Sequence, residues 1–424
     1  MRIYTQNETE SSAVFSRMSE QSDVGSLVGE ILRDVAENGD KALFHYAKLF
    51  DRAELTTLEV PQSELEAALE ETPKELLSAM QTAAENIRAF HRMQVREGFR
   101  MQKPDGSYMG QKITPIERVG LYIPGGTASY PSTVLMNAIP AKIAGCAQIV
   151  MVSPPSKNGR IASPILAAAK LAGVDRVFQV GGAQAIAALA YGTETVPKVD
   201  KIVGPGNAYV AEAKRQVFGR VSIDMIAGPS EILIIADESA NPAFLAADLL
   251  SQAEHDVLAS AILITPSLAL AGRVSEEVER QLKLLPREEI ARASIEKNGK
   301  ILIAGDLFSA VALSNRLAPE HLELCVVEPE ALLEQVTNAG SVFLGGSCPE
   351  ALGDYLAGPN HTLPTGGTAR FSSPLGVDDF IKKTQYTFFT PEALAGLSGQ
   401  IATFARAEGL EAHARAALIR NGEQ

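Results

Sequence analysis

The sequence has few of the residues that mark secreted or membrane proteins. It contains only three cysteines, Cys146, Cys325 and Cys348, which lie far apart. An odd number of distant cysteines argues against a disulfide framework and fits a reducing compartment, so we expect a cytoplasmic protein. No apolar run is long enough to span a bilayer, and the polar start of the chain, Met1 to Ser12, lacks the apolar core of a signal peptide. We therefore expect no membrane partner.

Positive charge is also scarce. The chain has 38 Lys and Arg residues against 51 Asp and Glu residues, which gives a net charge of -13. Nothing in it resembles a basic stripe, so we expect neither nucleic acid nor an anionic membrane surface as a partner. The 424 residues are 46% hydrophobic, which is ordinary for a globular protein of about two to four domains.

A complete dinucleotide-binding fingerprint, G-x-G-x-x-G, is missing. Residues 204–209, Gly-Pro-Gly-Asn-Ala-Tyr, come nearest but lack the last glycine, so the motif does not support a standard Rossmann pyrophosphate site. Glycine turns at residues 125–126, 181–182 and 204–206 could still present backbone N–H groups to an anion. They could equally do no more than turn the chain.

Short β-rich runs alternate with alanine-rich helical runs from Ile113 onward. For example, a strand-like run at 176–180 ends before two glycines and is followed by a helical run at 183–191. Repeated strand–glycine turn–helix units predict a parallel, doubly wound sheet, in which ligands gather at the carboxyl ends of the strands. The pattern recurs between residues 232 and 344, so we expect two similar α/β units. The N-terminal part, and the segment from about Pro374 onward, are expected to be helical.

Residues 251–256, Ser-Gln-Ala-Glu-His-Asp, close an apolar helical run. Gln252 and His255 are three residues apart and share a face if the helix continues through them. An amide oxygen and a neutral imidazole can together ligate a divalent metal. The pair is far less specific than H-E-x-x-H, and an ordinary amphipathic helix end has the same appearance.

Acidic and imidazole side chains also occur together elsewhere. Glu320-His321 follows a helical run; the histidine could serve as a general base near neutral pH, or the pair could be a solvated turn. Asp354 could supply a hard carboxylate ligand, and with His361 it flanks a loop rich in glycine, proline and asparagine. Loops of this kind often carry function.

The remaining histidines carry weaker signals. Glu408 and His413 lie on the last helical stretch, five residues apart, so they need not share a face, and either could be a surface residue. His45 and His91 have no acidic or cysteine cluster around them, which predicts surface or packed histidines.

Several longer motifs run in one order along nearly the whole chain. They are Val119-Gly-Leu-Tyr-Ile-Pro-Gly-Gly126, Val180-Gly-Gly-Ala-Gln-Ala-Ile-Ala-Ala-Leu189, Val203-Gly-Pro-Gly-Asn207, Ala227-Gly-Pro-Ser-Glu231, Leu250-Ser-Gln-Ala-Glu-His255, Pro319-Glu-His-Leu322 and Gly358-Pro-Asn-His-Thr-Leu-Pro364. Together they resemble the histidinol dehydrogenase family.

That resemblance implies an α/β fold of two incomplete Rossmann-like domains with doubly wound, mainly parallel sheets. Helical N-terminal and C-terminal segments and an aldehyde-dehydrogenase-like architecture are expected with it. We expect an N-terminal arm at 1–21, a larger α/β domain made of 22–121 and 231–375, and a second Rossmann-like domain at 122–230. A C-terminal helical tail at 376–424 would be exchanged with a partner subunit.

The resemblance also implies a zinc-dependent enzyme for the last steps of histidine biosynthesis. It would oxidise L-histidinol to L-histidine through L-histidinaldehyde, with two NAD. The positions that match zinc ligands are Gln252, His255, Asp354 and His413, for one zinc per subunit. The catalytic pair would be Glu320 and His321.

The other matched positions concern substrate, cofactor and partner. The substrate contacts would be Ser230, His361 and Glu408, together with His321 and the metal ligands Gln252, His255, Asp354 and His413. Positions assigned to NAD are Tyr122, Gln184 and Asn207. The family is an intertwined homodimer, so Glu408 and His413 would come from the other subunit.

In the family's reaction, His321 would remove the hydroxyl proton as hydride leaves for NAD, and would act again in the second oxidation. Glu320 would activate the water that attacks the aldehyde-level intermediate. Zinc would serve as a template for the substrate's imidazole and amine, although another divalent metal could occupy such a site. Three other interpretations stay open: a paralogue that oxidises another polar alcohol, a zinc hydrolase in which Glu320 activates water, and a metal-stabilised dimer without activity.

Overall fold

A computed structural model describes residues 1–5, 8, 12–15, 24–125 and 130–422 of the chain. The backbone forms two compact units. The main unit consists of Met1–Gln94 with Ile116–Phe380, and the second unit of Val95–Pro115 with Ile381–Gln424. Gly126, in the first predicted glycine turn, lies outside the described residues, as does much of the predicted arm at 1–21.

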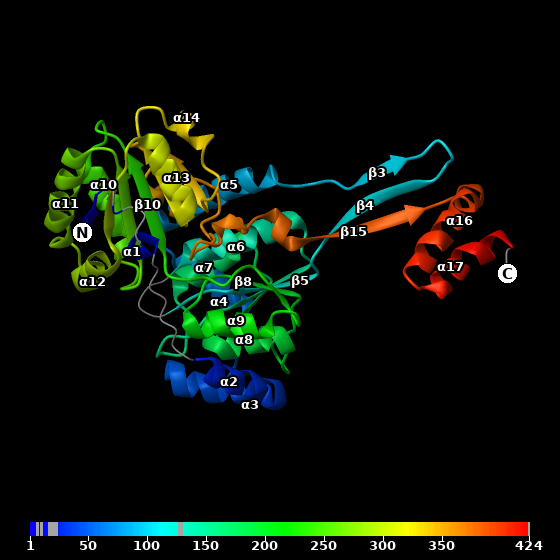
Figure 1. Cartoon of the computed structure of the whole chain (residues 1–424). Helices are drawn as coiled ribbons and strands as arrows, with labels where there is room; N and C mark the ends of the chain where they lie inside the picture. The colour runs from blue at the N-terminus through cyan, green and yellow to red at the C-terminus, as the bar shows by residue number, and fades with distance from the viewer. Residues whose placement is uncertain (6–7, 9–11, 16–23, 126–129, 423–424) are drawn as a thin grey trace. The chain divides into compact units, whose positions relative to one another are not determined.

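The main unit contains two six-stranded sheets, each covered by helices on both faces (Figure 1). In sheet A all neighbouring strands are parallel. Its strands, from edge to edge, are β1 (Arg2–Tyr4), β12 (Lys300–Ile303), β11 (Ser260–Thr265), β10 (Glu231–Ala236), β13 (His321–Cys325) and β14 (Ser341–Leu344). One face is covered by α10 (Pro242–Ala253), α11 (Leu268–Leu282) and α12 (Glu288–Asn298), and the other by α1 (Ser12–Phe15), α13 (Leu307–Leu317) and α14 (Pro329–Leu333). Because both faces are covered, β10 is buried along its whole length, as its apolar run predicts.

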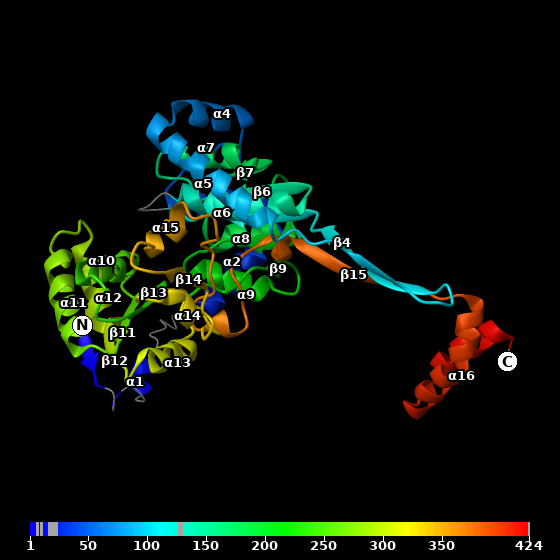
Figure 2. The same ribbon diagram turned by 90° about the horizontal axis from the view of Figure 1, so that it is seen from above.

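Sheet B has the same construction. Its strands are β2 (Glu59–Val60), β7 (Arg176–Phe178), β6 (Gln148–Val152), β5 (Arg118–Tyr122), β8 (Lys201–Val203) and β9 (Ser222–Ile223), and only β2 runs antiparallel to its neighbour. One face is covered by α4 (Gln62–Glu71), α5 (Lys74–Arg92), α6 (Pro131–Ala144) and α7 (Ser163–Ala172), which are seen from above in Figure 2. The other face is covered by α2 (Gly25–Asn38), α3 (Asp40–Tyr46), α8 (Gly182–Tyr191) and α9 (Ala208–Val217).

Shorter elements complete the main unit. They are the π-helical turn η2 (Ala47–Asp51), α15 (Glu350–Tyr355), η3 (Thr368–Arg370) and η4 (Val377–Phe380). Sheets A and B, with the helices that cover them, confirm the two predicted α/β units with parallel sheets. The last helix before β14 is short, since α14 ends at Leu333. The start of the chain, expected as an arm or small helix, supplies the edge strand β1.

The second unit corrects the expectation that the segment after Pro374 is helical throughout. Strand β15 (Ile381–Phe388) comes before α16 (Pro391–Ala407), α17 (Glu411–Leu418) and η5 (Ile419–Asn421). It pairs antiparallel with β4 (Tyr108–Pro115), which pairs with β3 (Phe99–Gln102). The partner of β15 lies more than 250 residues earlier in the chain, so local spacing gave no sign of the pairing.

The predicted domain boundaries at residues 121, 230 and 375 stay predictions. The sheets group the strands differently from the boundaries in two respects. Strand β2, from the range 22–121, and β5, which crosses the boundary at 121, belong to sheet B together with strands from 122–230. Strand β1, from the range 1–21, belongs to sheet A with the strands from 231 to 344.

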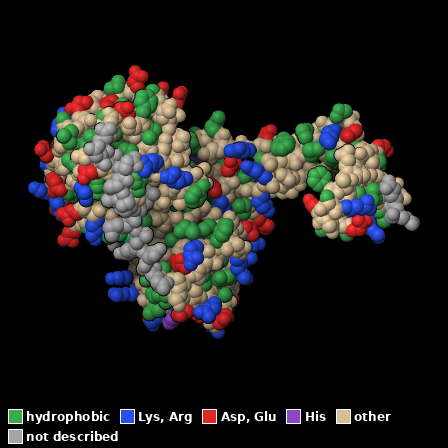
Figure 3. All heavy atoms as spheres, in the orientation of Figure 1, with side chains coloured by type: hydrophobic (Ala, Val, Ile, Leu, Met, Phe, Trp, Pro, Cys, Tyr) green, Lys and Arg blue, Asp and Glu red, His purple; other side chains and the backbone are tan. Residues whose placement is uncertain are grey.

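The surface carries charges of both signs. On the face drawn in Figure 3, acidic and basic side chains are interspersed over the main unit. Among the described residues, no helix is both long and apolar enough to cross a membrane.

Candidate active site

One cleft of about 880 Å³ in the main unit collects most of the predicted site residues. Those that line it are Ser230, Gln252, His255, Glu320, His321, Asp354 and His361. The glycine turn that follows β8, residues 204–206, forms part of the opposite wall. Sheet A thus contributes the amino ends of β10 and β13, whereas sheet B contributes the carboxyl ends of its strands, where doubly wound sheets usually bind ligands.

Glu320 and His321 are held by the backbone of one residue, Glu231. Strands β10 and β13 are hydrogen-bonded neighbours, and this brings Glu231 beside the start of β13. The Glu231 N–H donates to Glu320 Oε2 at 2.9 Å, and His321 Nδ1–H donates to the Glu231 carbonyl at 3.0 Å. Because a carbonyl can only accept, Nδ1 carries a proton and Nε2 is the nitrogen left to act on a ligand. Nε2 is buried and has no hydrogen-bond partner among the described residues.

Burial and neighbouring charges set the pKa values of the pair. Burial alone lowers the pKa of His321, but the negative charges of Glu320, Glu350 and Asp354 outweigh it and raise that pKa to about 10. Burial raises the pKa of Glu320 to about 7. A carboxyl group with a pKa near neutrality can both take up and release a proton, as general acid–base chemistry requires.

Three of the four candidate metal ligands, Gln252, His255 and Asp354, lie at the end of α10 and on α15. Gln252 and His255 were expected to share a helical face. They do not, because the helix α10 ends at Ala253. Instead a turn carries His255, in which its N–H donates to the Gln252 carbonyl at 3.1 Å. His255 is exposed at the cleft, and the partial loss of water around it lowers its pKa and favours the neutral imidazole that binds metals.

Gln252 gives the clearest sign that a ligand belongs here. The side chain is buried, and its Oε1 has no hydrogen-bond donor among the described residues. A buried amide oxygen without a partner costs free energy, and a cation would satisfy it. Together with the Asp354 carboxylate and the neutral His255 imidazole, this oxygen forms a donor set suited to zinc or a similar divalent metal.

Glu350 is a site residue that the sequence did not reveal. His321, Glu350 and Asp354 each present one potential ligand atom within 4.8 Å of the others. This group shares only Asp354 with the predicted zinc ligands. A possible signal was the spacing of Glu350 and Asp354, four residues apart on the short helix α15, because residues at this spacing share a face.

His361 lies in a loop that a second histidine supports. His361 Nδ1–H donates to the Asp354 carbonyl at 2.9 Å, and His361 Nε2 is 3.3 Å from Thr133 Oγ1. His91, on α5, is fully buried and its Nε2 lies 3.4 Å from the Asn360 amide nitrogen. His91 is therefore a packed histidine that supports the residue beside His361, one of the two roles predicted for it.

The residues predicted to bind NAD surround the carboxyl edge of sheet B. Tyr122 ends β5, and its hydroxyl accepts the Gly182 N–H at 3.2 Å. Gln184 is buried on α8, with an Oε1 that lacks a partner among the described residues. Asn207 is exposed and caps α9 by accepting the N–H groups of Tyr209 and Val210.

A buried ion pair that the sequence did not reveal holds the glycine turn. Gly204 has φ 114°, and a side chain there would collide with the Tyr122 carbonyl. The Gly204 carbonyl accepts from Lys214 Nζ at 3.0 Å, and its N–H donates to Asp224 Oδ2 at 2.7 Å. Lys214 and Asp224 also pair with each other, and both side chains are almost fully buried. A lysine on an amphipathic helix looks like a surface residue in sequence, so only the fold identified this pair.

Glu408 and His413 belong to the second unit. Glu408 follows α16 and His413 lies on α17, and both side chains are exposed. The described residues that line the cleft all belong to the main unit.

Comparisons with known proteins agree over nearly the whole chain. The family model described as histidinol dehydrogenase matches residues 15–421. A histidinol dehydrogenase from Halalkalibacterium halodurans is 57% identical over 393 residues, which cover 93% of this chain and 93% of the relative. The crystal structure of histidinol dehydrogenase from Elizabethkingia anophelis has a TM-score of 0.95 and 41% identity, and the match covers 100% of this chain and 98% of that one. An acetylating aldehyde dehydrogenase from Geobacillus thermoglucosidasius, 16% identical with a TM-score of 0.50 over 87% of this chain and 98% of that one, shares the fold.

Proposed function

Because the chain belongs to the histidinol dehydrogenase family, we propose that its cleft oxidises L-histidinol with Glu320 and His321 as the catalytic pair. The chain is an oxidoreductase of histidine biosynthesis that acts on histidinol with NAD. The observation that carries the residue assignment is the fixed orientation of the His321 ring. Its Nδ1–H is committed to the Glu231 carbonyl, while Nε2 is buried in the cleft wall without a partner among the described residues.

The two oxidations use His321 twice. In the first, Nε2 takes the proton of the substrate hydroxyl while the carbon loses hydride to NAD, which leaves the aldehyde. Water then adds to the aldehyde carbon: Glu320 takes the proton that the water loses, and the protonated Nε2 gives its proton to the aldehyde oxygen, so that the hydrated aldehyde forms and His321 is a base again. In the second oxidation Nε2 takes a hydroxyl proton from the hydrated aldehyde while hydride passes to a second NAD, and the carboxylic acid forms. A positioned base of this kind is worth about 10²- to 10⁴-fold in rate.

The proposed zinc ligands are Gln252, His255 and Asp354 of one subunit and His413 of the other. The unpartnered Gln252 oxygen and the lowered pKa of His255 support this set. When bound, zinc supplies a positive charge that orients the substrate nitrogens and opposes the effect of the neighbouring carboxylates on the pKa of His321. Ser230 and His361, which also line the cleft, and Glu408 of the other subunit would contact the substrate.

NAD would bind at the carboxyl edge of sheet B. Tyr122, Gln184 and Asn207 lie there, close to the turn that Lys214 and Asp224 hold. The last glycine of the fingerprint is missing here. We propose that the buried ion pair takes over its part in shaping the turn, because it fixes the backbone of Gly204. Hydride would then pass across the cleft, from the substrate beside the catalytic pair of sheet A to the NAD at the edge of sheet B.

The proposal is tested by counting NADH per substrate. We expect two NADH for each L-histidinol consumed, because the reaction removes four electrons. Activity should fall to background in a chelator and return when Zn²⁺ is added. One NADH per substrate, or full turnover by protein shown to be free of metal, would contradict the proposal. No NADH from histidinol, with metal bound, would favour a paralogous substrate or a hydrolase.

We also propose that the active site is shared between two subunits. The second unit exposes apolar side chains, among them Phe99, Phe388 and Phe404, and exposed apolar surface of this kind commonly marks an interface. His413 and Glu408 are exposed on the same unit, so a second copy of the chain could receive them.

Subunit mixing tests this arrangement. His413→Ala and His321→Ala proteins should each be inactive, because each lacks one component of every site. After exchange, a mixed dimer has one site with both residues intact, so about a quarter of wild-type activity should return at equal concentrations if mixing is random. Mixed dimers that are isolated with two different affinity tags, and yet inactive, would contradict sharing.

A further inference from the structure

The strand β13 carries an unexpected buried acid two residues after the catalytic histidine. Successive side chains on a strand alternate between faces, so His321, Glu323 and Cys325 share one face. Glu323 is only 1% exposed. A carboxyl group in the middle of a buried parallel sheet costs free energy unless it makes good hydrogen bonds.

Glu323 holds the first turn of α15. Its Oε1 accepts the backbone N–H of Glu350, the first residue of that helix, at 2.8 Å. The helix receives no side-chain cap from its own N-cap residue, Pro349. The first N–H groups of a helix have no partner within the helix, so Glu323 supplies from a neighbouring strand the acceptor that a capping side chain would normally provide.

The same turn is also held from α10. The hydroxyl of Ser251 donates to Glu350 Oε2 at 2.7 Å. Ser251 directly precedes Gln252, so the helix with the proposed amide ligand and the helix with the proposed carboxylate ligand are joined at Glu350. One turn further along α15, Asp354 Oδ1 lies 3.8 Å from His321 Nε2.

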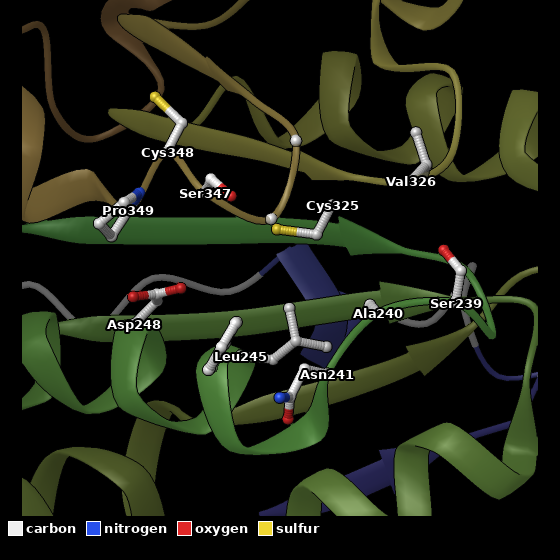
Figure 4. A pocket seen from close by; sticks show the side chains of 13 residues that line it. Ser239, Ala240, Asn241, Leu245, Asp248, Cys325, Val326, Ser347, Cys348 and Pro349 are labelled. Carbon is white, nitrogen blue, oxygen red and sulfur yellow. The ribbon is translucent and has the colours of Figure 1, made fainter.

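Behind Glu323 lies a second carboxyl group and a cavity. Asp248, on α10, shares a hydrogen bond with Glu323, and burial raises the pKa of Asp248 to about 6 and that of Glu323 well above its usual value. Asp248, Cys325 and Pro349 line a cavity of about 250 Å³ (Figure 4). This cavity lies at the carboxyl ends of β10 and β13, the opposite end of sheet A from the active-site cleft. Glu323 therefore contacts α15 from the side that faces away from the cleft, and it does not line the cleft.

We infer that Glu323 is a positioning residue that fixes α15 from behind the active site and thereby sets the affinity of the site for a divalent metal. It would act through the Glu350 backbone on Asp354, and through Asp354 on the metal. The inference rests on the proposed function in one respect, the assignment of Asp354 as a ligand.

The test compares the affinity of variants of the full chain for Zn²⁺, measured by competition with a chromophoric chelator. Glu323→Leu removes the acceptor of the Glu350 N–H, and we expect zinc to bind about 10- to 100-fold more weakly, the usual effect of losing a group that orients a ligand. Glu323→Gln keeps an acceptor oxygen and offers an N–H to Asp248, so its affinity should stay within about threefold of wild type, because the contact that matters is retained.

A matched control separates positioning from general loss of stability. Leu324→Ala removes a fully buried side chain from the other face of β13, so it should lower the free energy of unfolding without changing zinc affinity. If Glu323→Leu fails to fold because it leaves Asp248 buried without its partner, the double variant Asp248→Leu/Glu323→Leu removes both carboxyl groups. Replacing a buried polar pair by apolar residues is often tolerated, and the same loss of affinity is expected of the double variant.

The possible outcomes distinguish this inference from the proposed function. Asp354→Asn should lose zinc. If it binds zinc like wild type, the ligand assignment is wrong and the inference fails with it. If Asp354→Asn loses zinc while Glu323→Leu, or the double variant, binds it like wild type, only the positioning role is overturned. An equal loss of affinity in Leu324→Ala would also overturn it.

Discussion

Replacing His321 by asparagine is expected to lower kcat for histidinol oxidation about 10²- to 10⁴-fold, the range that a general base contributes. The asparagine amide can still donate to the Glu231 carbonyl, as Nδ1–H does now at 3.0 Å, so the local backbone should be kept. The nitrogen that takes the proton is lost, and with it the base for both oxidations. Steady-state NADH formation measures the effect, with KM for histidinol determined in parallel.

Binding measurements separate a loss of chemistry from a loss of structure. The variant should hold as much zinc as the wild type and bind NAD as tightly, because His321 is not among the proposed ligands of either. His45→Asn is the matched control, since His45 is an exposed histidine on α3, and its kinetics should be those of the wild type. A kcat within threefold of wild type for His321→Asn would remove this histidine from the mechanism.

Replacing Glu320 by glutamine should have its largest effect on the second half of the reaction. Burial raises the pKa of Glu320 to about 7, which suits a group that takes a proton from water near neutral pH. Glutamine is of nearly the same size and can accept the Glu231 N–H that Glu320 Oε2 now accepts, but it cannot accept a proton. We expect oxidation of L-histidinaldehyde to slow by about 10²- to 10⁴-fold.

Single-turnover kinetics show which half-reaction has changed. With excess enzyme and NAD, the first NADH should form at a rate within about tenfold of wild type, because His321 remains as the base for that step. The second NADH should appear slowly or be replaced by trapped aldehyde. Equal slowing of both phases would assign Glu320 a role in binding or orientation, and an unchanged second phase would exclude it as the group that activates water.

The periodicity of the sequence predicted much of the fold, for identifiable reasons. A strand covered on both faces must be apolar along its length, as in the run Ile232 to Ile235. A helix next to such a strand must be apolar on one side. These requirements are local, so the alternation of strands and helices in both sheets could be derived before the structure was known. The strands β3, β4 and β15 were not predicted because none of them has a buried face: β3 and β15 are almost entirely exposed, and most residues of β4 are half-buried. A strand without a buried face has no apolar alternation to detect.

The sequence identified most residues of the active site, but it showed little of how they are arranged. The motifs singled out Glu320, His321 and Asp354, and the cleft brings them together. Spacing alone could not show that one backbone residue, Glu231, holds both members of the catalytic pair, because that depends on the pairing of β10 with β13 across some 90 residues.

The supporting groups were decided by tertiary structure alone. Lys214 and Asp224 look like solvated charges in sequence, and Glu323 lies in a strand where a charge is not expected. Each gains its role only when folding buries it beside the group that it holds: the ion pair beside Gly204, and Glu323 beside the Glu350 N–H. The family, the alternating α/β pattern and the reactive side chains could all be derived from the sequence, because these follow from local spacing and from motifs. Other features depend on contacts between distant segments, which only the folded chain provides. They are the orientation of the His321 ring, the hydrogen bonds that hold α15, and the meeting of the amino edge of one sheet with the carboxyl edge of the other.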